Sequence, residues 1–158
     1  MSERSYRRLA PLALALTLLP AAAGAEEAAE ESARRFLSRP GREAGSLPFS
    51  DAVLAGDTHS VSGMLGLEAE TGMPPEDPET EVRLILDQLA SRLAAVDMTM
   101  ADVVSVQVFS PRLDLYEAFN AIYRTYFEEG AFPARAFVGS GPLLRDARFE
   151  VMAIAVRR

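Results

Sequence analysis

Apolar residues recur at spacings of three and four between residues 78 and 96, with charged and polar side chains between them. The apolar set comprises Val82, Ile85, Leu86, Leu89, Leu93 and Val96. This period places them on one face of an α-helix. Asp77 can accept a hydrogen bond from a free amide of the first turn, and Pro78 has no amide to lose. The pattern therefore predicts an amphipathic helix that begins at Pro78.

Shorter apolar segments, rich in β-branched residues and bounded by Gly, Pro or Asp, are typical of strands. They cover residues 52–56, 59–65, 103–109, 134–139 and 147–156. A second helix is expected from Asp114, as its cap, to about Glu129, with Gly130 as the left-handed residue that ends it. The expected order is β-β-α-β-α-β-β. Two helices packed on one face of such a sheet predict a two-layer α+β domain.

Several of the expected strands are apolar on both faces, which is more apolar surface than two helices can cover. The sheet face without helices therefore needs another partner. Self-association of identical chains is the simplest solution, although this pattern does not give the number of subunits.

The first 25 residues have the pattern of a secretory signal peptide. Arg4, Arg7 and Arg8 precede an apolar run over residues 9–25, which ends in Ala23-Gly24-Ala25. Cleavage is expected after Ala25, and a periplasmic or secreted protein follows. Pro11 and Pro20 interrupt the run, which is also shorter than the roughly 20 residues of a spanning helix, so no membrane anchor is expected after cleavage.

Residues 26–46 are rich in Ala, Glu and Arg and end in Gly and Ser. We expect a flexible or helical extension there, helical in its first part and a linker in its second. The folded domain is expected to span residues 47–158.

The composition narrows the possible chemistry. The chain has no Cys and no Lys, and His59 is its single histidine. Disulfides, thiolate nucleophiles, zinc ribbons, multi-histidine metal sites, lysine Schiff bases and P-loops are excluded. Any chemistry must therefore use Arg, Asp, Glu, Ser, Thr, Tyr, Asn and backbone groups. The net charge of −7 repels phosphates, so nucleic acid is not an expected partner.

Two charged residues lie inside otherwise apolar strands, Arg135 and Glu150. If their strands pair as a hairpin centred between Pro142 and Leu143, the two side chains lie opposite each other on one face. A guanidinium there can bind a carboxylate through two hydrogen bonds, and a nearby carboxylate can orient and deprotonate a water. The alternative is a pair of charges that neutralise each other at a subunit interface.

Three other positions are candidates. Asn120 falls in an aromatic helical stripe with Tyr116 and Tyr123, where its amide can donate to a ligand or bond locally. Ser62-Gly63, at the end of a strand, allows a ligand to approach the backbone closely, although such a pair also ends many ordinary strands. His59, beside an expected turn, is interpreted as a solvated or locally bonded side chain.

Several motifs resemble the RidA (YjgF) family over residues 47–158. They are Pro48-Phe49-Ser50-Asp51-Ala52-Val53, Val61-Ser62-Gly63, Phe119-Asn120 with Tyr123, Phe132-Pro133-Ala134-Arg135, and Phe149-Glu150-Val151-Met152-Ala153-Ile154-Ala155. The resemblance implies a chorismate-mutase-like fold and a homotrimer with ligand clefts between subunits. Family members hydrolyse reactive 2-imino acids, such as 2-iminobutanoate and 2-iminopropanoate, to 2-oxo acids and ammonia without a cofactor.

By this resemblance, Arg135 would bind the substrate carboxylate and Glu150 would position the attacking water. Ser62 and the backbone around Gly63 and Phe137 would contact the substrate. Phe49 and Asn120 would come from the adjacent subunit. The expected partner is thus a small metabolite that carries a carboxylate, and the alternatives are a trimer that binds such a molecule without turnover and a structural or chaperone-like trimer.

The sequence departs from the family at five positions. Phe49 stands in place of Tyr, Met64 in place of Gln, and Phe137 in place of Cys or Ser. Gly139 stands in place of Glu, and Leu144 in place of Pro. These departures predict a more apolar, differently shaped pocket. Endoribonuclease activity is attributed to some relatives, but the acidic charge and the lack of a basic groove argue against it here.

Overall fold

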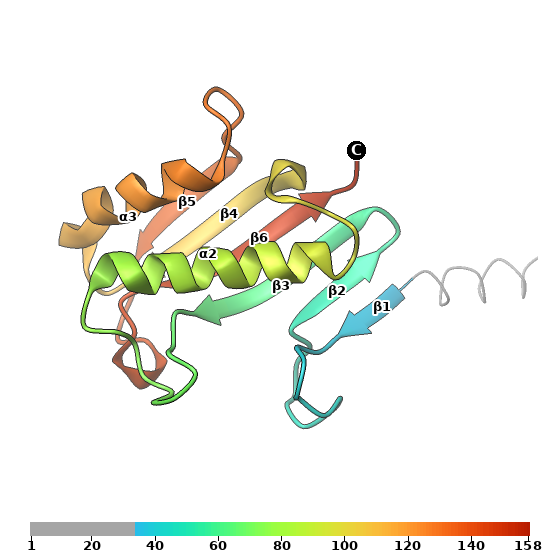
Figure 1. Cartoon of the computed structure of the whole chain (residues 1–158), viewed down its shortest axis with the longest axis horizontal. Coiled ribbons are helices and arrows are strands. Elements are labelled where there is room, and N and C mark those ends of the chain that lie inside the picture. Colours follow the sequence, from blue (N-terminus) through green and yellow to red (C-terminus); the bar gives the residue numbers. More distant parts are fainter. Residues whose placement is uncertain (1–33) are drawn as a thin grey trace, which may run out of the picture. The chain divides into compact units, whose positions relative to one another are not determined.

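The computed structural model describes residues 34–158 as one mixed sheet with two α-helices (Figure 1). The strands are β1 (Arg34–Leu37), β2 (Ala52–Ala55), β3 (Thr58–Leu65), β4 (Val103–Ser110), β5 (Ala134–Gly139) and β6 (Glu150–Val156), and the helices are α2 (Pro78–Ala94) and α3 (Tyr116–Tyr123). The predicted signal peptide and the first part of the predicted extension lie outside the described residues. Within residues 34–158, no helix is long and apolar enough to cross a membrane.

Both helices lie on the same face of the sheet, so the predicted two-layer α+β architecture is confirmed (Figure 1). Helix α2 begins at Pro78 as expected, and the Asp77 carboxylate accepts from the amides of Glu79 and Thr80. Its predicted apolar face is fully buried at Val82, Ile85, Leu86, Leu89 and Leu93. Burial of this stripe against the sheet makes the core of the domain.

The order of the strands is β1-β2-β3-β6-β4-β5. Strand β5 runs parallel to β4, and β6 lies between β3 and β4, antiparallel to both. The predicted hairpin of the last two strands is therefore wrong. A strand that follows a helical crossover returns parallel to the strand before the helix, so α3 places β5 beside β4 rather than beside β6.

This topology puts Arg135 and Glu150 on opposite faces of the sheet. Arg135 lies beside Val106 of β4, whereas Glu150 lies beside Phe109. Because successive side chains of a strand alternate between faces, two positions three residues apart point to opposite sides. Val106 is buried under the helices, so Arg135 shares the helix side and Glu150 the side without helices.

Residues 34–37 form β1, which pairs antiparallel with β2. The expectation of a helix or linker is wrong for these residues, because pairing with a sheet edge overrides the helical propensity of Ala, Glu and Arg. Asp51 ties the following loop to β2: its carboxylate accepts from the amide of Arg39 at 2.8 Å and from Arg42 Nη1 at 2.8 Å. The folded unit thus starts before residue 47.

Helix α3 is shorter than predicted, because residues 124–126 form a 3₁₀ turn after Tyr123. Asp114 is not its cap: the Asp114 carboxylate instead pairs with the Arg112 side chain, at 2.9 and 2.6 Å. Gly130 has a φ of 85°, in the left-handed region as expected. The chain then turns directly into β5.

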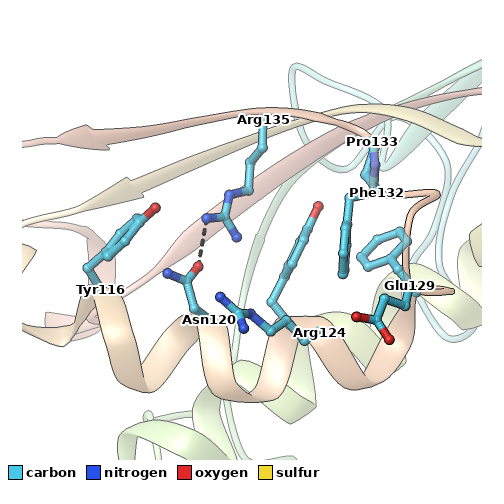
Figure 2. Close-up of a pocket in the computed structure, with 9 residues that line it drawn as sticks. Tyr116, Asn120, Arg124, Glu129, Phe132, Pro133 and Arg135 are labelled. Atoms are coloured by element: carbon cyan, nitrogen blue, oxygen red, sulfur yellow. Dashed lines mark hydrogen bonds between the residues drawn. The ribbon is translucent and has the colours of Figure 1, made fainter.

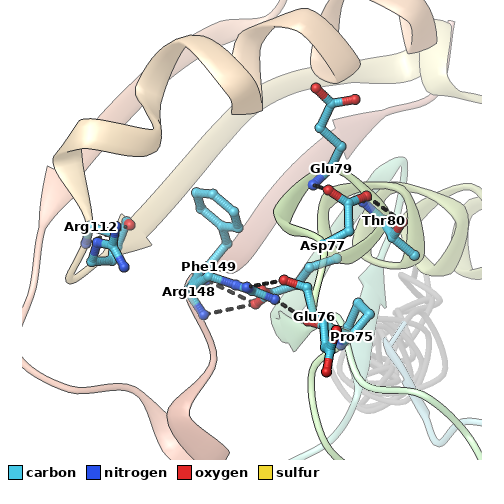
Figure 3. A network of polar contacts seen from close by, with 10 residues as sticks. Pro75, Glu76, Asp77, Glu79, Thr80, Arg112, Arg148 and Phe149 are labelled. Atoms are coloured by element: carbon cyan, nitrogen blue, oxygen red, sulfur yellow. Dashed lines mark hydrogen bonds and ion pairs between the residues drawn. The ribbon is translucent and has the colours of Figure 1, made fainter.

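A buried ion pair fixes the start of β6, where Glu150 lies (Figure 3). Glu81 of α2 is fully buried, and its carboxylate accepts from the Arg148 amide at 2.8 Å, from Arg148 Nε at 2.6 Å and from the Phe149 amide at 3.2 Å. The same guanidinium donates to the backbone carbonyls of Glu76 and Pro75. One arginine therefore joins α2, the loop before it and β6.

His59 is a correction to the sequence interpretation. Its side chain on β3 is fully buried rather than solvated, and neither ring nitrogen has a hydrogen-bond partner in the described structure. Burial lowers the pKa of His59 and outweighs the opposite effect of the nearby Arg92 backbone, and the charges of Arg92 and Arg35 lower it further. The imidazole is therefore neutral at neutral pH.

The sheet face opposite the helices exposes large apolar side chains. They are Val104, Val138, Met152, Ile154 and Val156, each more than a third exposed. That this face needs a partner stays a prediction, and these five side chains would make the contact.

Candidate functional site

Arg135 projects from β5, at the edge of the sheet, toward α3 (Figure 2). Its Nη2 atom donates to the Asn120 side-chain oxygen at 2.6 Å. Asn120 is 8% exposed, so the residues packed around it also hold its side-chain amide in place. This contact is neither of the two alternatives expected for Asn120, because its oxygen accepts from a side chain 15 residues away on β5.

Aromatic rings surround the guanidinium. The Arg135 Cζ atom lies 4.5 Å from the centre of the Tyr123 ring and 5.7 Å from those of Tyr116 and Phe119. Contacts of this kind attract a cation to the ring face and fix its plane. Burial raises the pKa of Tyr123 to about 12 despite the Arg135 charge, so its hydroxyl stays protonated and adds no negative charge to the site.

The guanidinium forms no ion pair with any carboxylate of residues 34–158. It borders an open pocket of about 720 Å³. Tyr116, Asn120, Tyr123, Arg124, Phe127, Glu129, Phe132, Pro133 and Arg135 line this pocket. A partly buried cation with donors to spare, at the wall of a pocket with aromatic sides, is suited to bind a small organic anion.

Glu150 belongs to a second group of candidate residues. A side chain at Gly63 would collide with the Glu150 carboxylate, so only glycine allows this approach. The neighbouring Ser62 donates from its hydroxyl to the Ser50 carbonyl at 2.7 Å and from its amide to the Asp51 carbonyl at 3.0 Å. Glu150, Gly63 and Ser62 thus form one cluster on β6 and β3, separate from the Arg135–Asn120 cluster.

The other predicted residues are placed differently. Phe49 precedes β2 and is 57% exposed, and β2 lies four strands from β5 in the sheet. The Phe137 ring packs edge-on against Tyr116 and Phe119, with centroids 5.1 and 5.4 Å apart, and does not line the pocket. The Phe137 side chain therefore supports the aromatic wall behind Arg135, and contact of its backbone with a ligand stays a prediction.

One expectation about subunits is also corrected. The resemblance implied that Asn120 reaches Arg135 from an adjacent chain, but here both belong to the same chain because α3 crosses directly over β5. Met64, expected to make the pocket more apolar, is buried in the core at 1% exposure.

Comparison with known proteins identifies the family. The family model described as Endoribonuclease L-PSP matches residues 41–157. The chain belongs to the endoribonuclease L-PSP (RidA/YjgF) family. Members of similar sequence include the 2-iminobutanoate/2-iminopropanoate deaminase of Escherichia coli strain K12, which is 33% identical over 113 residues that cover 70% of this chain and 88% of that protein.

A RutC family protein of Haemophilus influenzae is likewise 33% identical, over 114 residues. Solved structures of the RidA/YjgF family have the same fold. The Escherichia coli YjgF gene product superposes with a TM-score of 0.70 at 29% identity, covering 78% of this chain and 99% of that one. Escherichia coli TdcF with bound serine gives a TM-score of 0.69 at 27% identity, covering 78% and 100%.

Sequence reasoning missed part of the pocket of this RidA-family chain. Four further residues line the pocket: Arg124, Glu129, Phe132 and Pro133. Of these, the sequence motifs include only Phe132 and Pro133, without a role in a pocket. Arg124 could have been found, because it follows Asn120 by four residues and helical side chains at that spacing are neighbours. The loop residue Glu129 has no such signal.

Proposed function

We propose that this chain is a cofactor-independent imine deaminase that hydrolyses 2-imino acids to 2-oxo acids and ammonia. The observation that carries the proposal is the Arg135 guanidinium, which is oriented by Asn120 and three rings, has no carboxylate partner in residues 34–158, and borders a pocket. The deaminase name of a relative 33% identical to the chain supports it. The solved structure of Escherichia coli TdcF with bound serine, a small carboxylate, supports binding of such molecules.

In the proposed reaction, Arg135 binds the substrate carboxylate and so fixes the adjacent C=N carbon. A protonated imine is already electrophilic, so orientation and a base supply most of what the reaction needs. The Glu150 carboxylate takes a proton from a water as its oxygen bonds to the carbon. Glu150 returns this proton to the nitrogen of the resulting amino alcohol, ammonia leaves as the C–N bond breaks, and the hydroxyl proton passes to solvent as the 2-oxo acid forms.

The two clusters require that more than one chain build the site. Arg135 and Glu150 lie on opposite faces of the sheet, with β4 between their strands. We therefore propose that the β5 edge of one copy, with Arg135 and Asn120, packs against the helix-free face of another, with Glu150, Gly63 and Ser62, in a homotrimer. Phe49, far from β5 in its own chain, would also be supplied by the second copy.

The enzymatic claim is tested with an imine made in place by an amino acid oxidase. The full-length protein should shorten the lifetime of the 2-imino acid, and Arg135→Ala should lower the rate about 100-fold or more, because it removes the group that orients the substrate. Arg34→Ala, an exposed arginine on the opposite edge strand, is the matched control and should keep full activity. An unchanged imine lifetime with wild-type protein would refute turnover.

One observation favours a second candidate, a carboxylate-binding trimer without turnover: the base Glu150 is absent from the pocket of its own chain. Such a protein would show a higher melting temperature with a 2-oxo acid, lost in Arg135→Ala, and no effect on imine lifetime.

We also propose that residues 1–25 direct export and are removed after Ala25, on the sequence pattern alone. The intact mass of the protein from the periplasmic fraction or medium should then match a chain that starts at Glu26. A mass that retains residues 1–25 contradicts the proposal.

A further inference from the structure

The pocket contains a second cation. Arg124 follows α3 directly and lines the pocket together with Arg135. Arg124 follows Asn120 by four residues, and both side chains line the pocket with Arg135 (Figure 2). Helical side chains at positions i and i+4 are neighbours. Arg124 is exposed, in contrast to the half-buried Arg135.

Neither cation is neutralised by the described part of the chain. Among residues 34–158, no carboxylate forms an ion pair with Arg124 or with Arg135. Glu129 also lines the pocket, but it bonds to neither arginine. Other arginines of the described residues do have carboxylate partners: Arg112 pairs with Asp114, and Arg148 with Glu81.

Two positive groups without an ion pair thus line one pocket, in a chain whose net charge is −7. Two positive charges that line one pocket repel each other. A ligand with two negative charges relieves this repulsion best. A ligand with one carboxylate would neutralise Arg135 and leave Arg124 without an anion.

We propose that the pocket selects 2-imino dicarboxylates, in which the carboxylate next to the imine binds Arg135 and the distal carboxylate binds Arg124. The short methylene chain between them would lie against the rings of Tyr116 and Tyr123. This inference rests on the proposed function, because it assigns Arg135 the same carboxylate. It makes Arg124 the residue that determines specificity.

The test compares two stable product analogues of equal chain length, 2-oxoglutarate and 2-oxopentanoate, which differ in the distal carboxylate. Their affinities for the full-length protein are measured by calorimetry. Wild-type protein should bind 2-oxoglutarate about tenfold more tightly, as expected for one charge-assisted contact. Arg124→Gln should remove this preference, and added salt should weaken it in wild-type protein because Arg124 is exposed.

Two variants control for charge and for identity of the side chain. Arg34→Gln removes one positive charge at the far edge of the sheet and should leave the preference unchanged. Arg124→Lys keeps the charge and should retain part of it. Circular dichroism of each variant checks that the fold is intact.

The outcomes separate the two claims. Equal affinities in wild-type protein, or a preference that survives Arg124→Gln, would overturn the dicarboxylate inference and leave the deaminase proposal standing. Tighter binding of phenylpyruvate than of 2-oxoglutarate would also overturn the dicarboxylate inference, because it would show that the pocket selects ligands with an aromatic side chain. Unchanged binding of both analogues to Arg135→Ala would instead refute the proposed site itself.

Discussion

At the scale of single residues, the environment of a charge decides its use more than its position in the sequence. Arg135 and Glu81 are both charged residues next to apolar ones, yet Arg135 meets an amide and three rings, whereas Glu81 meets a guanidinium and two amides. The first keeps donors for a ligand and the second has its charge neutralised. His59 is a third case, buried with neither a charge nor a partner in the described structure.

The buried His59 predicts a pH dependence of stability. The pKa of His59 is lowered from 6.5 in the folded chain, first by desolvation. As the pH falls below 6.5, the unfolded chain therefore binds a proton that the folded chain does not, and the free energy of unfolding decreases. The stability that wild-type protein has relative to His59→Leu should decrease between about pH 7.5 and pH 5.

Urea unfolding of both proteins over this range measures the difference. Because other titrating groups are common to wild type and variant, they cancel in the comparison. If the difference in the free energy of unfolding stays constant with pH, the pKa of His59 is the same in the folded and the unfolded chain, and the prediction is wrong.

At the scale of elements, the sequence predicted the helices and strands of residues 47–158 from local signals: apolar spacing for α2, and short β-branched apolar runs for the strands. It could not predict β1, whose four residues have helix-forming neighbours and are strands only because β2 offers an unpaired edge. Nor did it predict which strand lies beside β5 in the sheet. The crossover rule for a strand, a helix and a strand would have placed β5 beside β4 had it been applied.

The Glu81–Arg148 pair joins three such elements, and its loss should be measurable. Arg148→Met leaves the Glu81 carboxylate buried without a counter-charge, so the free energy of unfolding should fall by about 3 kcal/mol. The double variant Glu81→Gln with Arg148→Met should recover part of this loss, because the buried group is then neutral. Denaturant unfolding of the two single variants and the double variant gives the coupling, and additive losses would contradict it.

At the scale of the whole molecule, the candidate residues could be named from sequence but not assembled. Arg135, Asn120 and Glu150 all stood out as polar residues in apolar surroundings, and the Arg135–Asn120 contact is found in the fold. The predicted meeting of Arg135 with Glu150 depended on the order of the strands, which no local pattern contains. Faces and strand order are properties of the complete sheet, and they divide the site in two.

A divided site predicts complementation between inactive variants. Arg135→Ala and Glu150→Gln should each be inactive alone. When the two are unfolded, mixed and refolded together, about a quarter of the sites in random trimers should combine an intact Arg135 with an intact Glu150, and activity should return to about that fraction. If both residues served from one chain, the mixture would stay inactive.

The stacking of Arg135 on tyrosine also gives the protein a built-in optical reporter. The chain has no tryptophan, and three of its four tyrosines, Tyr116, Tyr123 and Tyr126, lie in or just after α3. Two of them flank the guanidinium that a ligand would engage. Occupancy of this pocket should consequently change the intrinsic ultraviolet emission of the unlabelled protein, with little background from elsewhere in the chain.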